Sequence, residues 1–298
     1  MYLGWSEGFH DAAASVIDEN GNIVFASHSE RFSGNKHEKF ISPELKHYID
    51  KNFSCHTTAF FEKLLLKKTR QLYAGQFKTV FNPRKLAWTP DVSFHHHKSH
   101  AAATFQTSNF DEAAAVVVDS IGEWDTTTIW KCSYNSEGEA QYKKMYSKKY
   151  PTSIGLWYTS LTHFVGLKPL DEEYIFMGMA AFGEPKYNLE DQLWRNNHRG
   201  VGDIFPKARS EDLAASIQDL YERELLKLVE MCPHENLVIM GGCALNCVAN
   251  SKIKNKNIWI MPSPGDAGSA LGAAALVLKR KLKWRNPYLG TFIGKGVN

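Results

Sequence analysis

Apolar and polar positions in the first thirty residues alternate in short runs. "MYLGWSEGFHDAAASVIDENGNIVFASHSE" predicts a strand, a polar turn that holds His10 and Asp11, a small-residue strand, a Glu-Asn-Gly-Asn turn and a third strand. "AAAVVVDSIGEWDTTTIWKCSYNSEGEAQYKKMYS" repeats that order. Two similar meanders, each followed by mostly helical segments, indicate a duplicated α/β unit. A cleft between the two copies is then the expected ligand site.

The remaining segments carry weaker signals. "SPELKHYIDKNF" and "TTAFFEKLLLKKTRQLYAG" have helical periodicity and Ser or Thr caps, and a loop then enters a short strand before His95. Residues 153–165 and 210–232 are predicted helices, the second of them amphipathic. "ENLVIMGGCALN" reads as a buried strand running into a Gly-Gly turn and a helix. "NIWIMPSPGDAGSALGAAALVLKRKL" repeats that plan with a Pro-Gly-Asp turn.

Composition narrows the class of protein. With 298 residues, of which 43% are hydrophobic and 22% charged, the chain is globular and long enough for a large core or two lobes. The net charge of +3 permits an anionic substrate without requiring a polyanion. Five scattered cysteines, no basic leader and no apolar run near the roughly eighteen residues of a membrane span predict a cytoplasmic chain with reduced thiols.

The stretch "FHHHKSH" suggests a metal site. His96 and His100 are four positions apart, and "SHAAATFQ" after them reads as a helix, so both imidazoles would lie on one face and could hold one cation. Asp119 at the end of a hydrophobic strand and Asp266 in a tight turn would project into the cleft. Two histidines with two aspartates suit iron, manganese or zinc and leave positions open for a ligand. The alternative is a histidine-rich surface turn.

Two glycine turns are candidate phosphate sites. Gly241 and Gly242 follow a strand and precede a helix, where backbone N–H groups and the helix dipole would face a phosphate or ribose. Gly265 and Gly268 flank Asp266 in a comparable turn. Close packing is the alternative explanation for each glycine.

Six blocks of the chain, in order, resemble a known family. They are "GFHDAAASVIDENGNIVFASHSERFSGNKHE", "HHKSHAAATF", "VVDSIGEWDTTTIW", "EEYIFMGMAAFGEP", "GGCALNCVAN" and "PSPGDAGSALGAA". They are similar to O-carbamoyltransferases of the NodU/CmcH type, from about residue 2 to residue 290. The resemblance implies an α/β actin-like ATPase (ASKHA) fold with duplicated ribonuclease-H-like lobes, related to the enzymes of threonylcarbamoyl-adenosine synthesis. We expect the lobes to span residues 1–110 and 111–298, with the C-terminal helix packing back on the first.

The resemblance also implies an activity. In this family a carbamoyl group passes from carbamoyl-adenylate, made from carbamoyl phosphate and ATP, to a hydroxyl of a small acceptor such as a sugar, a natural product or a hydroxymethylated nucleotide. The family's His-x-x-x-His pair and two later aspartates bind one metal, usually taken to be iron, that contacts nucleotide phosphate oxygens. The matching positions in this chain are His96, His100, Asp119 and Asp266. Manganese and zinc are the alternatives to iron.

Five further residues take roles by resemblance. His10 is the candidate general base, and Asp11 orients it. Lys36 and His37 resemble a basic segment of the family near the donor or acceptor, and Asn246 is expected to contact the ribose or adenine. The alternatives are a turn histidine capped by its neighbour at His10 and a solvated loop at Lys36.

The chain departs from the family pattern in two places. Ile175 stands where family members usually carry a lysine, so any phosphate contact of that lysine is absent or supplied elsewhere. The sequence also ends soon after "NPYLG", where typical members continue into a YrdC-like domain that makes carbamoyl-adenylate. The chain would then be either a fragment or a stand-alone form that receives carbamoyl-adenylate from a separate protein.

Two other functions remain open from the sequence. One is transfer of a carbamoyl-type group onto tRNA or DNA, which ranks lower because no interleaved basic and aromatic platform is visible. The other is a non-catalytic nucleotide-binding scaffold, suggested by Ile175 and by the missing domain. A homodimer without membrane attachment is the expected state.

Overall fold

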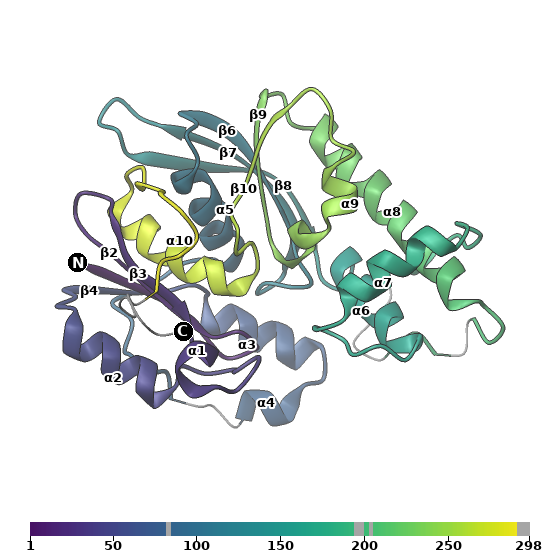
Figure 1. Cartoon of the computed structure of the whole chain (residues 1–298), viewed down its shortest axis with the longest axis horizontal. Coiled ribbons are helices and arrows are strands. Elements are labelled where there is room, and N and C mark those ends of the chain that lie inside the picture. Colours follow the sequence, from purple (N-terminus) through teal and green to yellow (C-terminus); the bar gives the residue numbers. More distant parts are fainter. Residues whose placement is uncertain (82–84, 194–199, 203–204, 291–298) are drawn as a thin grey trace, which may run out of the picture.

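A computed structural model describes residues 1–81, 85–193, 200–202 and 205–290, which form two five-stranded sheets (Figure 1). The first sheet has the order β3-β2-β1-β4-β5, with β1 (Tyr2–Ser6), β2 (Ala13–Ile17), β3 (Ile23–His28), β4 (Thr57–Phe60) and β5 (Val92–Ser93). The second has the order β10-β9-β6-β7-β8, with β6 (Glu112–Val118), β7 (Asp125–Tyr134), β8 (Ala140–Lys149), β9 (Asn236–Met240) and β10 (Asn257–Ile260). Each sheet consists of an antiparallel meander joined to two parallel strands. The duplicated α/β unit expected from the sequence is confirmed.

The remaining helices lie between the strands in the sequence. Those among the strands of the first sheet are α1 (Glu30–Ser33), α2 (Pro43–Asn52), α3 (Leu64–Tyr73) and α4 (Phe77–Phe81), and those among the strands of the second are α6 (Ile154–Phe164), α7 (Glu173–Met179), α8 (Ser210–Glu230) and α9 (Cys247–Asn250). Serine side chains cap the N-terminal ends of two of these helices. Ser42 and Ser153 accept hydrogen bonds from backbone N–H groups in the first turns of α2 and α6. No helix in the described part of the chain is long and apolar enough to cross a membrane.

Two helices, α5 (His96–Thr107) and α10 (Asp266–Leu278), run through the middle of the molecule (Figure 1). They pack against each other, and α10 also packs on β1 and β2 of the first sheet. Most residues of both helices are buried, and α10 is rich in alanine and apolar along most of its length. Small residues allow a close approach: a Cβ at Gly272 would lie 1.8 Å from the carbonyl oxygen of Ser99.

That close approach gives a stability prediction. Gly272→Ala would force α5 and α10 apart, and we expect a loss of about 3 kcal/mol in the free energy of unfolding, or roughly 5–10 °C in Tm. Thermal unfolding followed by circular dichroism measures the change. Gly178→Ala is the matched control, because it is also a helical glycine but has open space around its Cβ position, so its Tm should be unchanged or slightly raised. Equal Tm values for the two variants would contradict the packing described here.

The predicted type of one segment was partly wrong. The segment from Thr57 was predicted to be helical, but Thr57–Phe60 is strand β4, parallel to β1, and the helix begins only at Leu64. A short apolar run fits a buried strand and a helix equally well by periodicity, and the neighbouring strand provides the hydrogen bonds that decide between them. Glu62 therefore lies two residues after the end of a strand.

Candidate metal centre

Four side chains from three separate segments converge at the N-terminal ends of α5 and α10. The Nε2 atoms of His96 and His100 lie 3.0 Å apart. Asp119 follows β6, and its Oδ2 lies 3.0 Å from His96 Nε2. Asp266 is the first residue of α10, and its Oδ1 lies 3.2 Å from His96 Nε2 and 3.4 Å from His100 Nε2. One possible ligand atom from each residue thus falls within 4.8 Å of all the others.

The chemistry of these donors fits a divalent cation. Two imidazole nitrogens and two carboxylate oxygens form a mixed set that iron, manganese and zinc accept. Among the described residues, the Nδ1 atoms of both histidines are buried and have no hydrogen-bond partner. Burial lowers the pKa of His96, but the charge of Asp266 and hydrogen bonds to both aspartates raise this pKa well above its ordinary value. A bound cation would neutralise the same carboxylates in place of the protons.

Backbone groups hold Asp119 in place. Its Oδ1 accepts hydrogen bonds from the N–H groups of Ser120, at 2.7 Å, and Gly242, at 3.3 Å, which leaves Oδ2 directed at the histidines. Gly241 makes this turn, with φ of 95° and its Cα so close to Val118 that a Cβ would lie 2.2 Å from the carbonyl oxygen. The glycine turn after β9 therefore orients a candidate metal ligand.

The histidines and the carboxylates differ in exposure. The side chains of His96 and His100 are 3% and 0% exposed, whereas those of Asp119 and Asp266 are about 10% and 11% exposed. The histidines thus close the inner side of the cluster, and solvent reaches it from the side of the carboxylates. An additional ligand would approach from that side.

Two buried glutamates that were not among the expected site residues lie beside His96. Glu123 Oε1 accepts a hydrogen bond from the His96 backbone N–H at 3.0 Å, next to the start of α5. Glu62 Oε2 lies 3.9 Å from His96 Nδ1, and its Oε1 accepts a hydrogen bond of 2.6 Å from Lys67. A carboxylate behind a metal-bound imidazole typically fixes its tautomer. Glu62 is therefore the candidate partner of the ring nitrogen that faces away from the cluster.

This arrangement predicts the effect of Glu62→Gln. We expect the affinity for Mn²⁺ to fall about tenfold, at the low end for such partners because the separation exceeds hydrogen-bond length. Isothermal titration calorimetry measures the affinity. Since the substitution also leaves Lys67 without its carboxylate, the double variant Glu62→Gln/Lys67→Met is the control for stability. Affinities equal to that of the original chain in both variants would show that Glu62 does not act on His96.

The turn between β1 and β2 places His10 and Asp11 beside the cluster. His10 Nδ1 lies 2.7 Å from Asp11 Oδ2. Burial lowers the pKa of His10, but the hydrogen bond to Asp11 and the charges of Asp266 and Asp119 outweigh it and raise the pKa. With Nδ1–H donated to Asp11, Nε2 carries the lone pair that can accept a proton.

The other expected site residues have structural contacts. Lys36 is largely exposed and lies 3.2 Å from Asp171. Asn246 caps α9 and forms a reciprocal amide pair with Gln218, which leaves one side-chain N–H for a ligand. Gly265 has open space around it, so a ligand can approach its backbone.

Gly268 is explained by packing. A Cβ there would lie 1.9 Å from the carbonyl oxygen of Ser263, and its N–H donates to the carbonyl of Gly265. This geometry favours the packing alternative over contact with a nucleotide.

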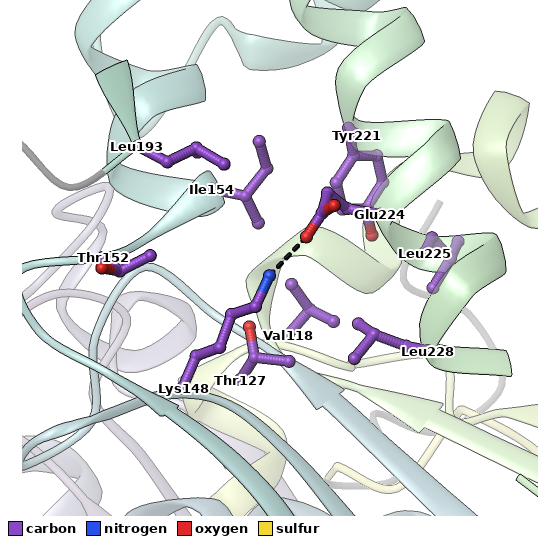
Figure 2. A pocket seen from close by; sticks show the side chains of 10 residues that line it. All are labelled: Val118, Thr127, Lys148, Thr152, Ile154, Leu193, Tyr221, Glu224, Leu225 and Leu228. Atoms are coloured by element: carbon purple, nitrogen blue, oxygen red, sulfur yellow. Dashed lines mark hydrogen bonds and ion pairs between the residues drawn. The ribbon is translucent and has the colours of Figure 1, made fainter. Parts of the chain in front are cut away.

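A small cavity lies between the second sheet and α8 (Figure 2). Its volume is about 10 Å³, and Lys148 and Glu224 form an ion pair across it (Figure 2). Space of this size holds about one water molecule and no nucleotide. A shallower groove of about 560 Å³ borders the end of α2. None of the four cluster residues lines either of these two spaces.

Solved structures share this architecture. The activator of 2-hydroxyisocaproyl-CoA dehydratase from Clostridium difficile, with bound ADPNP, aligns with a TM-score of 0.55 at 11% identity over 93% of this chain and 94% of that one. Component A of (R)-2-hydroxyglutaryl-CoA dehydratase from Acidaminococcus fermentans aligns with a TM-score of 0.54 at 12% identity over 92% and 96%. These likenesses concern the fold alone, and the expected actin-like ATPase fold is confirmed.

Relatives by sequence extend along most of the chain. The uncharacterized protein sll1178 of Synechocystis is 33% identical over 94% of this chain and 57% of its own length. The uncharacterized protein MJ1051 of Methanocaldococcus jannaschii is 27% identical over 97% and 60%. Nodulation protein NolNO of Sinorhizobium fredii is 25% identical over 90% and 46%. The chain therefore spans about half the length of these relatives.

A family model accounts for most of the sequence. The model described as "Carbamoyltransferase N-terminus" matches residues 43–202 and 198–275. The matched range includes α5, β6 and the start of α10, and so contains all four residues of the metal cluster. The chain belongs to the carbamoyltransferase family.

Proposed function

We propose that this chain transfers a carbamoyl group from carbamoyl-adenylate to a hydroxyl of a small acceptor. The observation that carries the proposal is the convergence of two histidines and two aspartates on one point beside His10. Family membership supplies the type of group transferred. We consider three classes of acceptor, which are a sugar, a natural product and a hydroxymethylated nucleotide.

Four residues would hold the metal, namely His96, His100, Asp119 and Asp266. Iron is the first candidate, with manganese and zinc as alternatives, and the bound cation would offset the negative charge of the donor phosphate. Gly265, at the start of α10, leaves backbone accessible next to Asp266. The N-terminal dipole of α10 adds to the attraction for a phosphate.

His10 is the proposed general base. Asp11 holds its Nδ1–H, so Nε2 can take the proton of the acceptor hydroxyl as that oxygen attacks the carbamoyl carbon. The new bond joins the acceptor oxygen to the carbamoyl carbon, and the bond from that carbon to the phosphate oxygen breaks. AMP leaves with the bonding electrons. The reaction balances as acceptor hydroxyl plus carbamoyl-adenylate giving carbamate ester, AMP and a proton.

A transfer assay tests the proposal. The purified chain is loaded with Fe²⁺ or Mn²⁺, a separate enzyme supplies carbamoyl-adenylate, and a panel of sugars and hydroxymethylated nucleosides serves as acceptors. We expect AMP release above the protein-free rate and an acceptor carrying one carbamoyl group by mass spectrometry. Binding of the metal and of AMP without donor consumption would instead indicate a non-catalytic scaffold.

A further inference from the structure

A chain of hydrogen-bonded side chains connects the two lobes. Asp171 lies in the loop between α6 and α7, whose helices pack into the core of the second lobe. Its Oδ1 lies 2.9 Å from Nε2 of His37, a residue of the first lobe. His37 belongs to a loop that is hydrogen-bonded to the β1–β2 turn, through Gly8 N–H to the Lys39 carbonyl and Ala12 N–H to the Glu38 carbonyl. The two lobes thus meet at His37 and Asp171.

The contact continues to the candidate base. His37 Nδ1 lies 3.0 Å from Asp11 Oδ1, and the other oxygen of Asp11 holds His10 at 2.7 Å. Each carboxylate oxygen of Asp11 therefore faces one imidazole. Each neighbouring pair is in hydrogen-bonding distance along the series His10, Asp11, His37 and Asp171. The series begins in the first lobe and ends in the second.

The backbone supports the same group of residues. Asp11 and His37 have φ of 50° and 56°, and Leu170, next to Asp171, has φ of 65°. These are three of the five non-glycine residues with positive φ in the described part of the chain. Such conformations are uncommon for residues with a Cβ and gather at functional sites, where surrounding contacts hold them. In this chain, the positive-φ conformations occur at or beside the residues whose side chains contact one another, namely Asp11, His37 and Asp171.

The contacts of His37 with two carboxylates indicate where its ring carries protons. Both ring nitrogens of His37 face carboxylates, so both contacts are hydrogen bonds only when both nitrogens carry protons. Such an imidazolium binds Asp11 and Asp171 together. Asp11 is then an anion that accepts Nδ1–H of His10, which leaves His10 Nε2 as the acceptor.

We propose that Asp171, in the second lobe, is a positioning residue that fixes His10 through His37 and Asp11. This inference rests on the proposed function, in which His10 is the base. Asp171 holds His37, His37 holds Asp11, and Asp11 fixes the ring and tautomer of His10. The orientation of the base in the first lobe therefore depends on a carboxylate of the second lobe.

The test uses the whole metal-loaded chain and two readouts. Asp171→Ala should lower kcat for AMP release from carbamoyl-adenylate about 10- to 100-fold while leaving KM, bound metal and Tm unchanged. Long-range ¹H–¹⁵N spectra of the histidine rings, recorded on the chain loaded with diamagnetic Zn²⁺ and with His10 assigned from the His10→Gln variant, should show loss of the pure Nδ1–H tautomer of His10. Asp171→Asn, which keeps an oxygen for His37 but no charge, should give an intermediate effect.

Lys168 provides the matched control. Its Nζ lies 2.7 Å from Asp171 Oδ2, but the side chain is largely exposed and is not part of the series His10, Asp11, His37 and Asp171. Lys168→Ala should therefore change kcat by no more than about twofold. Unchanged His10 ring signals in both Asp171 variants would overturn the proposal whether or not the chain is active. If those signals change but the original chain consumes no donor, the positioning role stands and the proposed function fails. A loss of kcat in Lys168→Ala as large as that in Asp171→Ala would also overturn the positioning role of Asp171.

Discussion

Replacement of His96 by alanine is expected to remove the metal and with it carbamoyl transfer. The Nε2 atom of His96 is the ring nitrogen nearest both carboxylates, at 3.0 Å and 3.2 Å. If about 12 kcal/mol of binding is shared among four ligands, one ligand contributes about 3 kcal/mol, which is more than 10²-fold in affinity. Metal analysis by mass spectrometry after dialysis and AMP release from carbamoyl-adenylate measure the two losses.

His97 is the control for His96. It is the next residue of α5 and equally buried, but its Nδ1 lies 2.9 Å from the Thr128 hydroxyl and it points away from the cluster. Burial lowers the pKa of His97 well below its ordinary value. His97→Gln should keep one metal per chain. A His96→Ala protein that retains metal as tightly as the His97 variant would contradict the assigned ligand set.

Replacement of His10 by alanine is expected to lower carbamoyl transfer by about 10²- to 10⁴-fold, the usual contribution of a general base. Metal content and affinity for AMP should not change, since His10 is not one of the four ligands. Initial rates of AMP release with saturating donor and acceptor measure the effect.

Asp11→Asn distinguishes a base from a residue that only shapes the turn. An asparagine keeps the size of the side chain but removes the charge that raises the pKa of His10 and fixes its Nδ1–H. We expect a smaller loss of rate than in His10→Ala. Normal transfer in the His10→Ala protein, with bound metal, would exclude His10 as the base.

The four residues of the metal cluster could be predicted from the sequence because each stands in a recognisable local pattern, although they come from three separate segments. Spacing of four on a helix places His96 and His100 on one face whatever the rest of the fold does. Asp119 ends a strand and Asp266 begins a helix, and the ends of parallel strands with the following helices share one edge of a sheet.

The contacts around the cluster depend on long-range structure. Glu62 could have been noticed as an acid at a strand end, had the preceding apolar run been interpreted as a strand. The pairing of His37 with Asp171 joins residues 134 positions apart through loops with positive φ, and no periodicity signals it. Gly268 resembled a ligand turn in sequence, whereas its neighbours show a packing position.

Anomalous X-ray diffraction from crystals grown with Mn²⁺ and AMP tests the central claim most directly. We predict a single strong peak about 2.1 Å from Nε2 of His96 and His100 and from carboxylate oxygens of Asp119 and Asp266, with the AMP phosphate beside it. A peak bound by other residues, or no peak at the cluster despite bound AMP, would contradict the metal site and the transfer chemistry proposed for it.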